Sequence, residues 1–253
     1  MMKILKVITK RKTLYGVVIL IAFWYIAHII INSNTVPGPF ETFTAFIRLA
    51  GEGLFIHIGA SLVRIFAAAA ISIIIGVPLG LWIGFSLKAD AILSPILYLL
   101  YPIPKVAFLP VFFLLFGLGD TSKVILIITI IIFQIIMATR DGIKEIPMEL
   151  IYSVKSLGLK TLGMYRHLIL PAALPRIISS LRISVGISIS VLFFTENYGT
   201  FYGIGYFIMY QWSVLRYTEM FAGIIGFSLM GFFMFRILDL VEKKLCPWIF
   251  IQK

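Results

Sequence analysis

Few residues of this chain have the types and spacing that catalysis or metal binding requires. The three histidines, His28, His57 and His167, lie far apart in the sequence, and Cys246 is the single cysteine. Zinc sites use Cys and His ligands at short, characteristic spacings. The sequence also offers neither a Ser-His-Asp set nor a paired carboxylate site. We therefore expect a chain that is not an enzyme by itself and that holds no cofactor or metal.

The segment FGLGDTSK at 116–123 superficially resembles a phosphate-binding loop. Such a loop needs Gly-Lys-Ser/Thr at the start of a helix, whereas here Lys123 follows Ser122 and precedes Val124. We interpret the segment as a turn between helices and not as a nucleotide site.

Three charged residues, Arg64, Lys105 and Glu196, lie within or beside strongly apolar segments. A charge at the bilayer centre costs about 3 kcal/mol even on lenient scales, so such residues usually face a cavity or a partner. Arg64 and Glu196 are predicted on the same side, where a pair would offset part of this cost and form a gate. The alternative, that each side chain extends separately to the membrane interface, is equally open. Arg64 and Lys105 suit an anion's path, and they suit structural pairing equally well.

The composition of the whole chain indicates the class of protein in which these residues lie. The chain has 253 residues, of which 60% are hydrophobic and 13% charged, and its mean hydropathy is +1.04. These values indicate an integral membrane protein. The net charge of +11 does not indicate nucleic-acid binding, because no soluble basic domain is left once the apolar runs are removed.

Long uncharged runs predict the membrane spans. Residues 91–119 would form a straight helix of about 43 Å, which is too long for a single crossing of about 30 Å, and two crossings of about 14 residues would be too short. Lys105 and three prolines divide this region, so we predict one broken span and six spans in all. The uncharged runs are 14–40, 65–87, 91–104, 106–119, 124–139, 183–195 and 220–235.

The N-terminal run at 14–32 is interpreted as a retained extra span, because it is long for a signal peptide and is followed by no small-x-small cleavage site. We expect a turn and a short interfacial helix after it. With the N-terminus inside, 17 of the 22 Lys and Arg residues fall on the inner side. The positive-inside rule then places both termini in the cytoplasm. No linker divides the chain, so 1–253 is expected to be a single membrane domain with a core at about 56–242.

Gly76, Gly80 and Gly84 are spaced four residues apart in one predicted span. They form a groove on one helix face that lets another backbone approach closely. Packing inside one subunit is the favoured explanation, and a moving or subunit interface is the weaker alternative.

The basic segment 140–176 interrupts the apolar pattern. Pro147, Glu149 and Gly158 mark the start, first turn and stop of a short helix at 147–157. Apolar residues then recur at helical spacing up to Pro171, which is expected to end the second helix. The segment is therefore predicted to be a helix, a turn and a helix at the cytoplasmic surface. A basic amphipathic helix that merely lies on anionic lipid is the alternative.

The spacing from Gly158 over nine residues to Leu168-Ile169-Leu170-Pro171 resembles the cytoplasmic loop signature of permease subunits of binding-protein-dependent ABC importers. The usual Glu-Ala-Ala is replaced here by Tyr152-Ser153-Val154. Five further segments resemble the nitrate, sulfonate and taurine branch of that family. They are SLVR at 61–64, YPIPKVAFLPVFFLLFGLGDTSK at 101–123, LPAALPRI at 170–177, Glu196, and GIG at 203–205.

The resemblance implies an all-α, multi-pass permease of the type I importer fold in a bacterial inner membrane. It also implies a symmetric dimer with a second copy, two cytoplasmic ATPase subunits that hold the ATP and Mg, and an external solute-binding protein. The ATPase-docking residues carried over from the family are Glu149, Tyr152, Ser153, Val154, Gly158, Leu168, Leu170 and Pro171.

The resemblance favours a small anion as substrate, such as taurine, another sulfonate or nitrate. A heterocyclic vitamin precursor such as a pyrimidine is the alternative within the same branch. A membrane transporter subunit outside the ABC class is the wider alternative, and it predicts no dependence on Gly158. An intramembrane enzyme is disfavoured, because it would need paired His, Asp or Ser residues at membrane depth.

Overall fold

The computed structural model describes residues 12–250, and within this range every regular element is helical. The element order is α2 (Lys12–Ile31), α3 (Pro39–Glu52), α4 (Leu54–Phe85), α5 (Leu87–Leu100), η1 (Lys105–Phe108), α6 (Leu109–Phe116), α7 (Asp120–Lys144), α8 (Met148–Ser156), α9 (Thr161–Met164), η2 (Tyr165–Ile169), α10 (Leu170–Thr195), α11 (Ile204–Ser213), α12 (Tyr217–Leu245) and η3 (Pro247–Phe250).

Four helical stretches of the described chain are long and apolar enough to cross a membrane. They are α4, α7, the stretch Leu162–Thr195 and α12, and the bent pair of α5 with η1 and α6 makes a fifth if it counts as one span. The predicted total of six stays a prediction, because α2 is apolar but its described part, Tyr15–Ile31, is shorter than the four candidate spans. A short helix, α3, is present where the interfacial helix was expected.

The predicted break in the 91–119 region is confirmed. α5 ends at Leu100, and the axis of the following helical stretch, Lys105–Phe116, turns by 78°. Tyr101 and Ile103 each precede a proline, and the proline ring disfavours helical geometry in the residue before it. The two prolines therefore stop α5 and set the bend.

The expectation that Pro171 ends a helix is wrong. A π-helical turn at Tyr165–Ile169 joins α9 to α10, and Pro171 lies in the first turn of α10. The N–H of Leu170 bonds to the carbonyl of Tyr165, five residues back. Proline is tolerated at a helix start because its missing N–H needs no partner there, and the π turn shifts the bonding pattern before it. One helical stretch of 34 residues, Leu162–Thr195, therefore replaces the shorter span predicted at 183–195.

The core lies where α7 packs between α4 and α10. A Cβ on Gly80 would lie 2.6 Å from Cβ of Thr139 and 2.8 Å from the carbonyl oxygen of Ile136, both on α7. A Cβ on Gly76 or Gly84 would likewise lie within 3.0 Å of an isoleucine side chain of α7. The three glycines therefore let α4 and α7 of the same chain approach closely, as the favoured explanation predicted.

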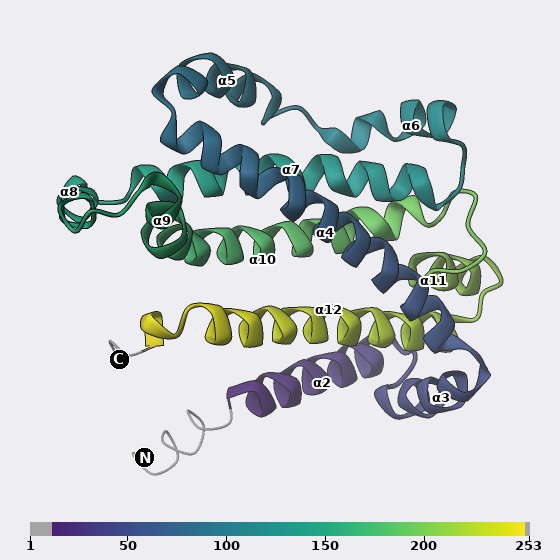
Figure 1. Cartoon of the computed structure of the whole chain (residues 1–253). Coiled ribbons are helices and arrows are strands. Elements are labelled where there is room, and N and C mark those ends of the chain that lie inside the picture. The colour runs from purple at the N-terminus through teal and green to yellow at the C-terminus, as the bar shows by residue number, and fades with distance from the viewer. Residues whose placement is uncertain (1–11, 251–253) are drawn as a thin grey trace, which may run out of the picture.

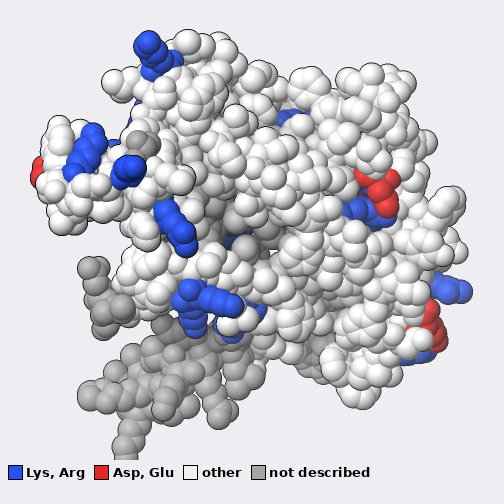
Figure 2. All heavy atoms as spheres, in the orientation of Figure 1, with Lys and Arg blue, Asp and Glu red and all other residues white. Residues whose placement is uncertain are grey.

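The long helices run roughly side by side, so that the molecule has two ends (Figure 1). α8, α9, the start of α2 and the finish of α12 lie at one end, which we call the α8 end. α3, α11 and the turn before α7 lie at the opposite end, the α11 end. In Figure 2 basic side chains gather at the α8 end, and the middle of this face is almost free of charge.

Candidate functional site

A buried ion pair joins two segments at the α11 end. Arg64 of α4 and Glu196, which caps α10, are separated by 2.5 Å between Nη1 and Oε1, and their side chains are 5% and 0% exposed. The predicted pairing of these residues is therefore present, and neither extends separately to solvent. Removing one partner of such a pair costs about 3–5 kcal/mol because the other charge stays buried.

All three guanidinium nitrogens of Arg64 donate hydrogen bonds. Its Nε donates to Asp120 Oδ1 at 2.9 Å, and its Nη2 donates to the backbone oxygen of Tyr202 at 2.7 Å. These contacts link α4, the first residue of α7 and the loop before α11. The guanidinium fixes the relative positions of three segments because its donors form a rigid fork.

The carboxylate of Glu196 is held by hydrogen bonds and by a closely packed glycine backbone. Its Oε1 accepts from Ser61 Oγ at 2.7 Å and its Oε2 from the backbone N–H of Gly205 at 2.8 Å. A Cβ on Gly203 would lie 2.6 Å from Oε2, so this position leaves no room for a side chain. The GIG segment thus has a structural role, which is to bring backbone against the carboxylate.

Three residues of this site were not singled out by sequence reasoning. Asp120 and Lys123 lie in the FGLGDTSK segment, which was interpreted only as a turn, and His57 was considered only as a candidate metal ligand. Lys123 is fully buried, and its Nζ donates to the carbonyls of Leu118 at 2.8 Å and Gly119 at 3.2 Å. His57 Nδ1 accepts from the N–H of Gly203 at 3.2 Å. A signal was available, because a charged pair three residues apart at the start of an apolar span needs compensation.

Lys105 does not join this cluster. It lies at the bend between α5 and α6, where its Nζ donates to the backbone oxygen of Leu100 at 2.9 Å and to that of Tyr101. These are the last carbonyls of α5, so the lysine caps the negative end of that helix. The three residues proposed for the translocation path therefore divide into one pair and one separate lysine.

A second charge cluster lies toward the α8 end. Asp90 of α5 accepts from Arg140 Nε at 2.7 Å and from Lys144 Nζ at 2.6 Å, both at the end of α7. Arg140 also contacts the Tyr98 hydroxyl at 3.2 Å. The cluster ties the start of the bent pair to the helix that leads into α8.

The predicted docking segment is an exposed projection. α8 covers Met148–Ser156, which confirms the expected short helix, and it extends from one end of the molecule in Figure 1. Large apolar side chains on it face outward, with Leu150 49% and Tyr152 61% exposed, and Leu157 directly after it is 74% exposed. Exposed apolar groups beside basic residues at one end are typical of a surface that a partner covers.

The other residues predicted to dock the ATPase differ in exposure and position. Glu149 lies in the first turn of α8, and Ser153 is exposed on the same helix. Val154 and Leu168 are partly buried and pack against the main core. Gly158 adopts a φ of 76°, the left-handed geometry that favours glycine after a helix. Leu170 and Pro171 begin α10 instead of ending a helix.

These features describe a multi-pass helical membrane protein, with a buried charge cluster at one end and an exposed projection of apolar and basic residues at the other. The family model described as binding-protein-dependent transport system inner membrane component matches residues 76–246. The chain belongs to this family. It is therefore the membrane permease component of an ABC importer, and ATP hydrolysis is not its own activity.

Two relatives match nearly the whole chain. The taurine transport system permease protein TauC of Escherichia coli (strain K12) is 31% identical over 238 residues, which cover 91% of this chain and 86% of TauC. The putative aliphatic sulfonates transport permease protein SsuC of Bacillus subtilis (strain 168) is 33% identical over 238 residues, which cover 91% of this chain and 84% of SsuC.

A solved structure supports the fold. The methionine ABC transporter MetNI in an inward-facing conformation matches with a TM-score of 0.64 at 19% identity, over 75% of this chain and 94% of that chain. The architecture is therefore that of a type I importer permease, as the sequence resemblance implied.

Proposed function

We propose that this permease imports a small anion of the sulfonate type, which an external binding protein delivers. The two relatives above, whose names refer to taurine and aliphatic sulfonates, support this class of substrate. In this proposal two copies of the chain form a symmetric dimer. Each copy docks one cytoplasmic ATPase subunit through α8.

The observation that carries the proposal is the shape of the α8 end. α8 exposes Leu150 and Tyr152 while Val154 packs inward against the core. A partner that binds the exposed face of α8 therefore moves a helix that packs against the core of the membrane helices. Closure of the ATPase pair on ATP would draw the two docked segments together, and rigid helices would transmit this movement.

At the opposite end, the Arg64–Glu196 pair is proposed as the gate. The pair joins α4 to the end of α10 and, through Tyr202, to the loop before α11. Movement of the α8 end changes the gate only if its contacts differ between two states of the permease. This assignment places the α8 end in the cytoplasm and the α11 end outside.

Uptake into proteoliposomes tests the proposal directly. The permease is reconstituted with its genomic-neighbour ATPase and binding protein, and ATP-dependent uptake of radiolabelled taurine is measured against unlabelled methanesulfonate, nitrate and a neutral aminopyrimidine. We expect the sulfonate to compete and the pyrimidine to have no effect. If taurine is not taken up, ATP-dependent uptake of the radiolabelled pyrimidine is measured in the same proteoliposomes, and its uptake would instead assign the vitamin-precursor class.

A further inference from the structure

The bend between α5 and α6 borders a small, half-open cavity against α7 and α10. Its volume is about 210 Å³, and its lining includes Lys105, Phe133, Gln134, Ile187 and Val191. Pockets for drug-sized ligands measure about 300–1,000 Å³. The cavity therefore suits a solute of only a few heavy atoms.

Lys105 brings a positive charge to this cavity without a carboxylate beside it. Among the described residues, each of the arginines Arg64, Arg140 and Arg182 has an acidic side chain within 3.1 Å. Lys105 has only the α5 carbonyls and the rings of Phe133 and Tyr101, whose centroids lie 5.1 and 5.5 Å from Nζ. An ammonium group has three donors, so one donor is left for a ligand.

Gln134 adds a second polar group from α7. Its Oε1 accepts from the Ser184 hydroxyl of α10. When the Ser184 hydroxyl donates its single proton to Gln134 and not to the Ser180 carbonyl, which lies 2.9 Å away, Nε2 of Gln134 has no hydrogen-bond partner among the described residues, and Gln134 lines the cavity. An ammonium and an amide N–H in one cavity are both donors, which is the complement of an oxyanion.

The rest of the lining is almost wholly apolar. Tyr101, Ile103, Val106, Ile130 and the residues of α10 surround the two polar groups. The low local dielectric strengthens the attraction between the ammonium group and an anion. The same lining offers nothing to a solute with many polar groups.

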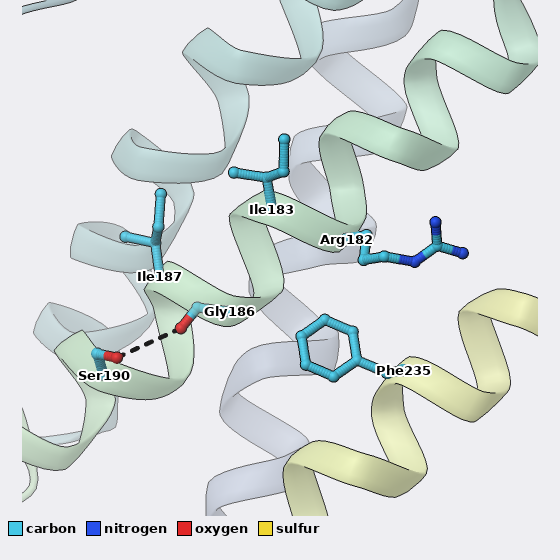
Figure 3. A pocket seen from close by; sticks show the side chains of 6 residues that line it. All are labelled: Arg182, Ile183, Gly186, Ile187, Ser190 and Phe235. Atoms are coloured by element: carbon cyan, nitrogen blue, oxygen red, sulfur yellow. Dashed lines mark hydrogen bonds between the residues drawn. The ribbon is translucent and has the colours of Figure 1, made fainter. Parts of the chain in front are cut away.

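The cavity adjoins an open hollow along α10. Ile187 lines both, and the hollow also contains Gly186, Ser190 and Phe235 of α12. In Figure 3 Ile183 and Ile187 point to one side of α10, whereas Arg182 extends to another. Arg182 is paired with Asp239 at 2.8 Å and Glu242 at 2.9 Å. Of the two cationic side chains that line these hollows in the described residues, Arg182 is therefore paired with carboxylates and Lys105 is not.

We propose that Lys105 and Gln134 form a binding site for a small monovalent oxyanion inside the permease. The ligand class is an anion with a short apolar body or none, such as an alkanesulfonate. This inference rests on the proposed import of a small anion, and it places a selective step within this chain in addition to the external binding protein. The alternative role for Lys105 is to cap α5 and nothing more.

Binding by the full-length permease in lipid nanodiscs separates these roles. Thermal stabilisation is titrated with methanesulfonate and with dimethyl sulfone, a neutral molecule of similar shape, at constant ionic strength. A ligand that binds only the folded state raises the apparent stability. We expect saturable stabilisation by methanesulfonate and none by the sulfone.

Three variants test the residues. Lys105→Gln keeps a donor for the α5 carbonyls but loses the charge, so affinity for methanesulfonate should fall about tenfold to a hundredfold, the range for a charged hydrogen bond. Lys105→Arg should recover most of the binding. Lys88→Gln, a change at an exposed lysine of α5, should have no effect.

Three results would overturn the site. They are equal affinity of Lys105→Gln and wild type for methanesulfonate, equal stabilisation by the sulfone and methanesulfonate, and no saturable stabilisation of the wild type. Because the measurement needs no ATPase, such a result leaves the docking proposal standing. Conversely, loss of ATPase association in the wild-type complex would refute docking while leaving the anion measurement intact.

Discussion

Arg64 shows how one buried side chain can hold several segments together. Its guanidinium bonds to Glu196, Asp120 and the carbonyl of Tyr202, and these partners belong to the end of α10, the start of α7 and the loop before α11. Because the carboxylate of Glu196 is fully buried, the charge pair exists only while these segments stay together. A change of state at this end must therefore break or exchange these bonds.

Glu196→Gln tests the gate at the residue scale. Glutamine keeps a similar shape but leaves the buried Arg64 with only the exposed Asp120 as a counter-charge, at a cost of about 3–5 kcal/mol. We expect a higher basal ATPase rate and less transport per ATP hydrolysed in the reconstituted complex. If transport and basal ATPase activity both stay at wild-type levels, the pair is not a gate.

A matched control lies at the same end. Arg48 and Glu219 are 2.9 Å apart, but the Arg48 side chain is 55% exposed. Exposed pairs contribute about 0–1 kcal/mol. Glu219→Gln should therefore leave the coupling of ATP hydrolysis to transport unchanged.

At the element scale, the contact between α4 and α7 depends on the absence of side chains. Gly80 lies against Thr139 and the carbonyl of Ile136, where a Cβ would come within 2.8 Å. A clash with a backbone carbonyl is not relieved by a rotamer change, so the helices must separate. The helices α4 and α7 would then lose their closest packing contact.

Gly80→Val should destabilise the permease by about 1–3 kcal/mol, the usual cost of overpacking. The measurement is thermal unfolding in detergent, followed by circular dichroism. Gly59→Val on the same helix is the control, because a Cβ there meets nothing within 4 Å. Equal melting temperatures for the two variants would show that the α4–α7 contact tolerates separation.

The elements differ in how far local patterns could predict them. The break in the α5–α6 region follows from prolines and helix length, so it was predictable, as were α3 and α8. The passage of the helix through Pro171 was not, because it depends on a π turn at Tyr165–Ile169 that no residue type specifies. The charges of Asp120 and Lys123 at the start of an apolar span indicated a need for partners, but the partner of Asp120 could not be predicted. The role of Asp120 depends on Arg64, which is 56 residues away in the sequence.

At the scale of the whole molecule, charge and shape divide between two ends. Basic side chains gather around α8, and the buried Arg64–Glu196 pair lies near α11 (Figures 1 and 2). α7 spans the distance, with Asp120 in the Arg64 cluster and Arg140 in the Asp90 cluster. Movement of α8 can therefore be transmitted along α7 to the α11 end. This mechanism requires that a partner bind α8.

Association of the permease with its ATPase tests this central claim most directly. Gly158 has a φ of 76°, and a Cβ there would meet nothing within 4 Å of this chain. Gly158→Arg should leave the permease inserted and abolish co-purification of the ATPase, because the left-handed turn disfavours other residues and the added side chain covers the docking face. Gly158→Asn, which tolerates that turn, should retain part of the association.

Gly51→Arg adds the same side chain on α3, where a Cβ also has open space, and serves as the control. We expect full ATPase recovery with wild type and Gly51→Arg, partial recovery with Gly158→Asn and none with Gly158→Arg. Recovery of the ATPase with Gly158→Arg at the wild-type level would contradict the docking role of the α8 segment.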